Sequence, residues 1–253
     1  LKEELQKKFA KKGEQVVKSN VLAIERVENE LKKVDYPNAW ILEEGDQPPL
    51  TNTDNSYYQN FIEPILALRG DELPVSAFNA DGSVPTGTSR FEKHGVAYLI
   101  PEWIPENCIQ CNQCAFVCPH ACIRPFVLDD QKETPTAFVT RPAVGLKGMK
   151  FRIQVTPHDC MGCGICANVC PAKNKALVMK PSTEMKDKEG SNWEFALHLP
   201  KPDTSVFKRA SVKGSQFETP LFEFSYACAG CGETPYLKNL TQMFNDNLFI
   251  IFI

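Results

Sequence analysis

Two copies of one cysteine pattern, C-x2-C-x2-C-x3-C-P, constrain the fold of this chain more than any other feature of its sequence. Two-residue gaps let three thiolates from one tight loop bind three corners of an iron–sulfur cube. We expect the fourth cysteine to begin a short helix, where the missing N–H of the following proline is no loss. The first copy contains Cys108, Cys111, Cys114, Cys118 and Pro119, and the second contains Cys160, Cys163, Cys166, Cys170 and Pro171.

The repeat itself predicts how the ligands are shared, because bacterial ferredoxins hold two [4Fe–4S] clusters with two such copies and the fourth cysteine of each copy binds the other cluster. The second loop also contains Gly162 and Gly164, which let backbone N–H groups approach the sulfur atoms and tune the potential. By this rule one cluster takes Cys108, Cys111, Cys114 and Cys170, and the other takes Cys118, Cys160, Cys163 and Cys166.

A non-redox alternative is a zinc-stabilised interaction scaffold, since four-cysteine zinc sites are also built from C-x2-C units. Zinc ribbons use two such pairs and need no third cysteine at equal spacing, so the repeat favours iron–sulfur clusters. Cys122 falls outside the pattern, and we expect it to be a free buried thiol. We expect none of the four histidines to be a ligand, although His120 and His158 lie near the cysteines in sequence; the other two are His94 and His198.

Cysteine usage and charge narrow the classes of protein further. Eleven cysteines in tight groups suit metal ligation in a reducing intracellular compartment better than a secreted disulfide framework. The net charge of −3 is spread without a block that would favour nucleic acid. The longest wholly apolar run, residues 248–253, is far shorter than the roughly 20 residues that cross a bilayer. Because the chain opens with Leu1 and stops in this run, we expect it to be an internal piece of a longer protein.

The rest of the sequence predicts an α+β protein in which irregular segments flank the cysteine repeat. Apolar residues at three- and four-residue steps predict one helix over residues 1–34. The next segment is rich in proline and turn residues, with a short helix expected at about residues 60–68. Residues 181–224 are expected to be polar and broken by prolines. A helix from Thr234 to Asn245 and a strand from Leu248 would open an α/β domain.

The last two cysteines, Cys228 and Cys231, form a C-x2-C pair that alone would be a weak signal. Their surroundings decide its meaning, because the segment C-A-G-C-G-E-T-P-Y at residues 228–236 closely resembles the opening of the thiamine-diphosphate domain of pyruvate:ferredoxin (flavodoxin) oxidoreductases. Further stretches resemble the same family in the same order. They are residues 73–78, 96–119, 151–154, 159–164 and 214–217.

This resemblance implies a layout and a function. It makes residues 1–35 the helical tail of a preceding domain and 36–95 a linker domain. Residues 96–180 would be the ferredoxin-like two-cluster domain, and 181–253 the start of the thiamine domain. The implied reaction is the oxidation of pyruvate with coenzyme A to acetyl-CoA and carbon dioxide. Electrons would pass through three [4Fe–4S] clusters to ferredoxin or flavodoxin, and the full enzyme would be a homodimer.

For the third pair, the resemblance implies that Cys228 and Cys231 are two ligands of the cluster nearest the thiamine, and that Glu233 contacts thiamine diphosphate. A carboxylate at the start of a helix is the simpler structural interpretation of Glu233. The family's other two ligands for that cluster, and its magnesium-binding residues, have no counterpart in this chain, so we expect no catalysis by this piece alone. The alternative function is a ferredoxin-type electron-wire subunit of another oxidoreductase.

Overall fold

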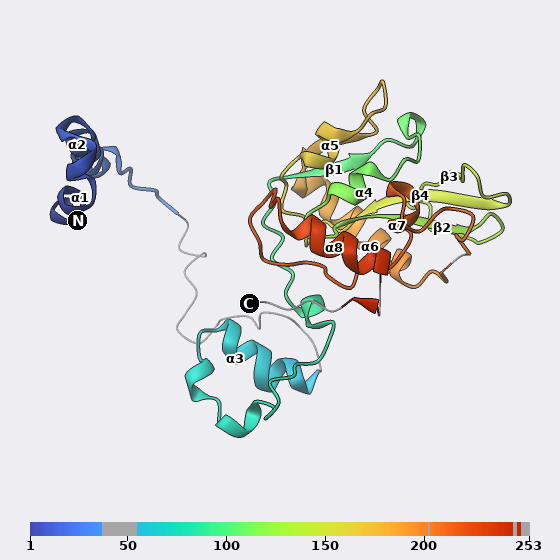
Figure 1. Ribbon diagram of the computed structural model, residues 1–253, viewed down its shortest axis with the longest axis horizontal. Helices are drawn as coiled ribbons and strands as arrows, with labels where there is room; N and C mark the ends of the chain where they lie inside the picture. Colours follow the sequence, from blue (N-terminus) through green and yellow to red (C-terminus); the bar gives the residue numbers. More distant parts are fainter. Residues whose placement is uncertain (37–54, 202, 245–246, 249–253) are drawn as a thin grey trace. The chain divides into compact units, whose positions relative to one another are not determined.

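A computed structural model describes residues 1–36, 55–201, 203–244 and 247–248 (Figure 1). The chain divides into two compact units, residues 1–52 and 53–253, and each is considered by itself. The four-part division made from the sequence remains a prediction. The mixture of helices and small antiparallel sheets around the cysteine repeat confirms the expected α+β class. None of the described helices has both the length and the apolar character that crossing a membrane requires.

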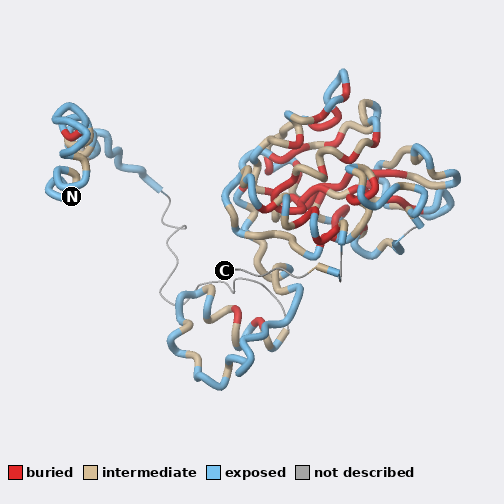
Figure 2. The backbone as a smooth tube through the Cα atoms, in the orientation of Figure 1, coloured by how far each residue is buried: buried red, intermediate tan, exposed pale blue. Residues whose placement is uncertain are grey.

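The N-terminal unit is a pair of helices, α1 (Lys2–Phe9) and α2 (Glu14–Glu30), with a short 3-10 turn between them. The prediction of one continuous helix over residues 1–34 is therefore wrong. Gly13 breaks it because its backbone adopts a φ of 100°, which a helix cannot contain. Val17, one of the apolar residues behind that prediction, is buried. Leu31 and Val34, which continue its three- and four-residue steps, lie beyond the end of α2 and are exposed (Figure 2).

The second unit begins with short helical turns. The expected short helix near residues 60–68 is confirmed by η3 (Tyr58–Ile62) and α3 (Glu63–Leu66). The side chain of Tyr58 is fully buried, and its ring lies 5.1 Å from that of Phe91 between centroids. Three further 3-10 turns follow: η4 (Gly70–Glu72), η5 (Val75–Ala77) and η6 (Thr88–Phe91).

The cysteine repeat is held between two antiparallel sheets. Strand β1 (Leu99–Trp103) pairs with β5 (Leu177–Pro181), which joins the two ends of the repeat. The second sheet has the order β2-β4-β3, with β2 (Ile123–Asp129), β4 (Met149–Val155) and β3 (Arg141–Pro142). The buried core runs through both sheets, with the Trp103 and Phe151 rings 6.3 Å apart between centroids (Figure 2).

Each copy of the cysteine pattern contains a one-turn helix, α4 (Gln113–Val117) or α5 (Ile165–Val169), and these two helices contact each other. The fourth cysteine of each copy follows its helix, so the prediction that it begins one is wrong. The reason is that the proline after it disfavours helical conformation in the preceding residue, and the cysteine therefore adopts an extended ψ of 118° in both copies.

Helix α6 (Ser182–Leu197) occupies a segment that we expected to be irregular. It packs on the β2-β4-β3 sheet through polar side chains as well as apolar ones (Figure 1). The carboxylate of Glu189 pairs with Arg152 of β4 at 2.7 Å, and the amide of Gln154 donates to the same oxygen at 2.8 Å. Because hydrogen-bonded neighbours satisfy this buried ion pair, it fixes the position of α6 on the sheet.

The chain ends with α7 (Val212–Ser215) and α8 (Thr234–Phe244). Helix α8 confirms the prediction of a helix from Thr234. Residues 249–253 lie outside the described residues, so the strand expected from Leu248 stays a prediction.

Candidate metal centres

Two cavities of nearly equal size are lined by the eight cysteines of the repeat. The first, with about 330 Å³ of empty volume, is lined by three cysteines of the first copy and by Cys170 of the second. The second, with about 350 Å³, is lined by three cysteines of the second copy and by Cys118 of the first, and Cys122, which lies outside the repeat, also lines it. The two sets are Cys108, Cys111, Cys114 and Cys170, and Cys118, Cys160, Cys163 and Cys166. The chain thus brings together the same two groups of four that the spacing predicts.

The surroundings of both cavities suit an iron–sulfur cube. Apart from the sulfurs, the lining is mostly apolar, with Trp103 and Leu177 in the first and Ile123 and Met179 in the second. Backbone amides approach the sulfurs: the N–H of Gly162 donates to the Cys160 Sγ at 3.4 Å, and that of Ala176 donates to the Cys170 Sγ at 3.4 Å. Hydrogen bonds to sulfur and a dry shell both tune cluster potential.

The cysteines act as ligands only as thiolates, and a nearby positive charge favours that form. Burial, with the neighbouring thiols adding to it, raises the pKa of Cys114 and of Cys166 well above the usual range. Burial also raises the pKa of Cys160 to about 12. Such thiols ionise when a cation is bound among them, since a coordinating thiol is deprotonated outright. Metal binding at these cysteines would therefore release protons from the thiols.

A single zinc ion fits these cavities less well. Four thiolates bind zinc by converging on one point about 2.3 Å from each sulfur. Among the described residues, no group of three or more His, Cys, Asp or Glu side chains is arranged to hold one ion in this way. The two sets instead exchange their fourth cysteines, which is the ligand sharing of two-cluster ferredoxins and not of a zinc ribbon.

The two cysteine loops have the same backbone shape with different residues. In the second loop, Gly162 and Gly164 have φ values of 69° and 74°. The equivalent residues of the first loop, Gln110 and Asn112, have φ values of 57° and 61°, which is uncommon outside glycine. Side-chain hydrogen bonds hold these two residues in place. Gln110 Nε2 donates to Pro142 O at 2.8 Å, and its Oε1 accepts from the N–H of Val144 at 2.7 Å.

A buried lysine lies where the first helix ends. Lys238 of α8 is only 1% exposed, and its ammonium donates to the carbonyl oxygens of Ala115 and of Phe116, the latter at 3.0 Å. Burial lowers the pKa of Lys238 to about 8, so it still carries its charge at neutral pH. At the equivalent end of α5, the exposed Lys175 donates to the carbonyl of Asn168 at 2.9 Å. Sequence reasoning missed Lys238, because nothing along the chain marks one lysine as buried beside residues more than a hundred positions away.

The third cysteine pair lies on the loop before α8, with Cys228 exposed and Cys231 half-buried. Gly230, between them, approaches the second cysteine loop so closely that an added Cβ would lie 3.6 Å from the Cβ of Cys163. The N–H groups of Thr234 and Glu233 lower the pKa of Cys231, as expected at a helix N-terminus. Glu233 is exposed at the residue before α8. The pair is therefore the neighbour of the second set of four.

Comparison with known proteins identifies the repeat. Residues 107–174 match a family described as a 4Fe-4S dicluster domain, and residues 43–97 match a family called EKR, described as a domain of unknown function. Over 99% of its length, the chain is 48% identical to a pyruvate:ferredoxin oxidoreductase of Moorella thermoacetica and 42% identical to a pyruvate-flavodoxin oxidoreductase of Klebsiella pneumoniae. It is also 44% identical, again over 99% of its length, to the mitochondrial pyruvate dehydrogenase (NADP(+)) of Euglena gracilis.

The chain carries a 4Fe-4S dicluster domain and is homologous to one segment of these oxidoreductases. It spans about a fifth of the length of the first two relatives, 22% of each, and 14% of the Euglena protein. The resemblance found in the sequence is thereby confirmed for the segment that the chain covers.

Within the dicluster domain, Cys122 is buried, as predicted, and its role as a free thiol stays a prediction. Its S–H lies 3.0 Å from the carbonyl oxygen of Asp159. A hydrogen bond from this thiol, opposed by burial and helped by the charge of Lys238, lowers the pKa of Cys118 to about 5. Of the histidines, His120 borders the second cavity, but its Nδ1–H donates to the carbonyl of Ser225 at 2.8 Å.

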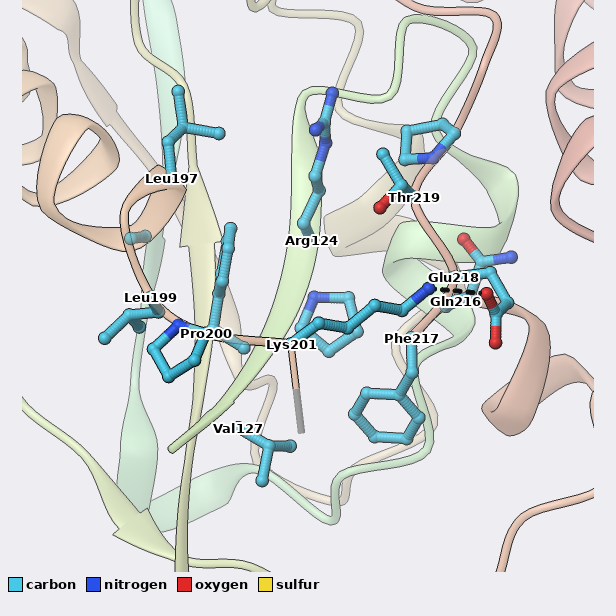
Figure 3. Close-up of a pocket in the computed structure, with 14 residues that line it drawn as sticks. Arg124, Val127, Leu197, Leu199, Pro200, Lys201, Gln216, Phe217, Glu218 and Thr219 are labelled. Carbon is cyan, nitrogen blue, oxygen red and sulfur yellow. Dashed lines mark hydrogen bonds and ion pairs between the residues drawn. The ribbon is translucent and has the colours of Figure 1, made fainter. Parts of the chain in front are cut away.

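A larger hollow lies away from both cysteine sets. It is formed by β2, the segment after α6 and residues 216–220, with an empty volume of about 740 Å³ (Figure 3). Its charged side chains are already paired, since the ammonium of Lys201 lies 2.7 Å from a carboxylate oxygen of Glu218. We assign it no part in electron transfer, because none of the eight cysteines of the repeat reaches it.

Proposed function

We propose that this chain is the electron-transfer portion of a pyruvate:ferredoxin oxidoreductase. It would carry electrons from thiamine-bound pyruvate oxidation, in which pyruvate and coenzyme A give acetyl-CoA and carbon dioxide, to ferredoxin or flavodoxin. The observation that carries the proposal is the crossed arrangement of the eight cysteines around two apolar cavities, with a third cysteine pair packed against the second.

Two [4Fe–4S] clusters, when bound, supply reversible one-electron redox chemistry. Cys108, Cys111, Cys114 and Cys170 would hold the first, and Cys118, Cys160, Cys163 and Cys166 the second. The apolar lining of each cavity excludes water from the sulfurs, and the amides of Gly162 and Ala176 donate to them. The ammonium of Lys238 holds a positive charge beside both sets, which favours addition of an electron there.

The third pair extends this arrangement toward the thiamine site of the full-length enzyme. Cys228 and Cys231 would supply two ligands of a third [4Fe–4S] cluster, and Glu233 would contact thiamine diphosphate bound with magnesium. The close approach of Gly230 to Cys163 supports a spatial order in which the third pair comes first, the second set next and the first set last.

The remaining parts of the proposal concern the whole enzyme. We propose a homodimer that works in a reducing compartment, the cytoplasm or an anaerobic organelle, because free cysteines in this number persist only where thiols stay reduced. Residues 36–95 would act as the linker domain, 96–180 as the dicluster domain and 181–253 as the start of the thiamine domain. Residues 1–35 would end the preceding domain.

Anaerobic reconstitution with iron and sulfide tests the proposal directly. The chain should bind about eight irons and show the broad visible absorption of two [4Fe–4S] clusters. After reduction with dithionite, it should pass electrons to added ferredoxin or flavodoxin. A protein that takes up stoichiometric zinc in preference, remains colourless with iron, or reduces neither carrier would contradict it.

A further inference from the structure

We propose that residues 92–95, at the end of the segment matching the family of unknown function, fasten two cysteine loops to each other. These are the loop that begins at Cys160 and the loop that holds Cys228. We call residues 92–95 the clasp. The inference rests on the proposed function to the extent that these cysteines bind clusters, and it assigns the matched segment a positioning role between them.

The first contact of the clasp is made by Lys93. Its ammonium donates to both carboxylate oxygens of Asp159, each at 2.8 Å. The Asp159 side chain is only 3% exposed, and the hydroxyl of Thr156 donates to one of the same oxygens at 2.6 Å. A nearly buried carboxylate whose two oxygens both accept hydrogen bonds from an ammonium is held firmly, unlike an ion pair in open solvent. Since Asp159 directly precedes Cys160, this anchor fixes the start of the second cysteine loop.

The backbone of Gly95 makes the next contact. Its N–H donates to the carbonyl of His158 at 2.9 Å, and its own carbonyl accepts from the ammonium of Lys186 of α6 at 2.9 Å. Gly95 has a φ of 56° and lies close to the Lys186 side chain, so a larger residue here would be strained. The clasp is therefore held to the dicluster domain by both side chains and backbone.

The remaining contacts reach the loop of the third cysteine pair. The hydroxyl of Tyr226 donates to a carboxylate oxygen of Glu92 at 2.6 Å, and it lies 3.0 Å from the Nε2 of His94, which can donate to it. The His94 ring also meets the edge of the Tyr226 ring, with centroids 4.9 Å apart. Tyr226 lies two residues before Cys228, so these contacts fix where the third pair begins.

Together, three consecutive side chains grip the residues just before two different cysteine loops. Gly230 also approaches Cys163, since an added Cβ on Gly230 would lie 3.6 Å from the Cβ of Cys163. Beside the hydrogen bonds that His120 makes to Phe224 and Ser225, those of the clasp are directional contacts that help set the separation of the third pair from the second set. The rate of electron transfer between the third cluster and the second depends on that separation, so the clasp would act on electron transfer by positioning the two cysteine loops.

Hydrogen exchange of the reconstituted chain, read by mass spectrometry, tests the grip on the third pair. Tyr226→Phe should speed amide exchange at residues 225–233 by about tenfold, the effect of losing one charge-assisted hydrogen bond, and Glu92→Gln, which keeps an acceptor but loses the charge, should speed it less. Iron content should not change. Tyr98→Phe, which alters an exposed tyrosine, and Arg69→Met, which breaks an exposed ion pair in the same matched segment, are the controls and should leave exchange unchanged.

A second readout tests the grip on the second loop. Lys93→Met leaves the Asp159 carboxylate without its countercharge beside Cys160, so the potential of the second cluster should become more negative while that of the first stays constant. Lys93→Arg, which keeps the positive charge, should keep the potential of the second cluster at that of the unaltered chain. Equal shifts of both clusters, or unchanged exchange at residues 225–233 in both Tyr226→Phe and Glu92→Gln, would overturn the clasp. If the unaltered chain bound no cluster, the proposed function would fail, whereas the exchange experiment on the metal-free chain would still decide the clasp.

Discussion

The two cysteine loops of the dicluster domain reach one backbone shape by different means. The second loop uses glycine at both left-handed positions, Gly162 and Gly164, so these two positions need no supporting side-chain hydrogen bonds. The first loop places Gln110 and Asn112 there and compensates with hydrogen bonds to distant backbone, including Asn112 Nδ2 to Lys213 O at 3.0 Å. The difference shows that a repeated ligand pattern can be held either by local conformational freedom or by tertiary contacts.

The connection between the two copies supplies the contacts of Gln110. Gln110 is held by residues 142–144, which belong to the segment between β2 and β4. The first loop is thus tied to parts of the chain that the second loop does not use. Replacing the fourth cysteine of either copy should have mirror-image effects on the two clusters, whereas replacing the supporting residues should affect the two loops differently.

The largest expected effect tests whether the loops share ligands. Cys118→Ala should remove the second cluster and leave the first largely intact, and Cys170→Ala should do the reverse, because each fourth cysteine lines the other copy's cavity. Iron content should fall from about eight to about four per chain, and EPR or Mössbauer spectra should report which cluster remains. Cys122→Ala keeps all eight ligands, although its thiol lies beside Cys118 at the second cavity, and should therefore keep about eight irons. Loss of the first cluster in Cys118→Ala would sink the crossed assignment.

The next prediction compares the cost of adding a side chain at each of the two glycines of the second loop. An added Cβ at Gly162 would lie 2.9 Å from the carbonyl oxygen of Leu99, whereas nothing lies within 4 Å of one at Gly164. Gly164→Ala should therefore destabilise the protein by about 1–2 kcal/mol, the cost of a left-handed non-glycine residue. Gly162→Ala should cost clearly more. The denaturant midpoint for loss of cluster absorption measures both, and equal midpoints would contradict the steric argument.

The third prediction compares the lysines at the ends of the two one-turn helices. Lys238→Met removes a buried positive charge and leaves carbonyl oxygens without a donor, so cluster potentials should become more negative and stability should fall by about 1–3 kcal/mol. Lys175→Met should change both much less, because Lys175 is exposed and water screens its charge. EPR-monitored redox titration of the two variants gives the comparison. Similar shifts in both would show that burial of Lys238 has no special effect.

The smallest effect concerns how the first loop tolerates its non-glycine residue. Gln110→Ala should lose two hydrogen bonds, to Pro142 and Val144, while keeping the left-handed strain. Gln110→Gly should lose the same bonds but relieve that strain, so it should be more stable than the alanine variant by about 1 kcal/mol. Chemical denaturation of the two variants measures this difference. An alanine variant as stable as the glycine variant would show that the backbone of this loop is unstrained.

From the sequence alone, the cysteine repeat, interpreted by the ligand sharing of bacterial ferredoxins, predicted the two groups of four that line the two cavities. The helix from Thr234 was equally predictable from its local pattern. Helix α6 was not, since its buried face includes Glu189 and Asn192 and so lacks a clear apolar stripe. Its polar groups are acceptable in the interior only because Arg152 and Gln154 of a distant strand pair with them.

The tertiary structure alone decided which charged and polar residues serve the cysteine sets. Lys238, Gln110 and Lys93 are ordinary polar residues in the sequence, and each acts on a segment 32 to 123 positions away. A polar side chain is stabilised in the interior only by the partners that folding brings to it, and those partners carry no local signal. Metal-ligand spacing is a short-range property of the chain, whereas the support of the ligands is long-range, and for that reason only the first could be deduced from the sequence.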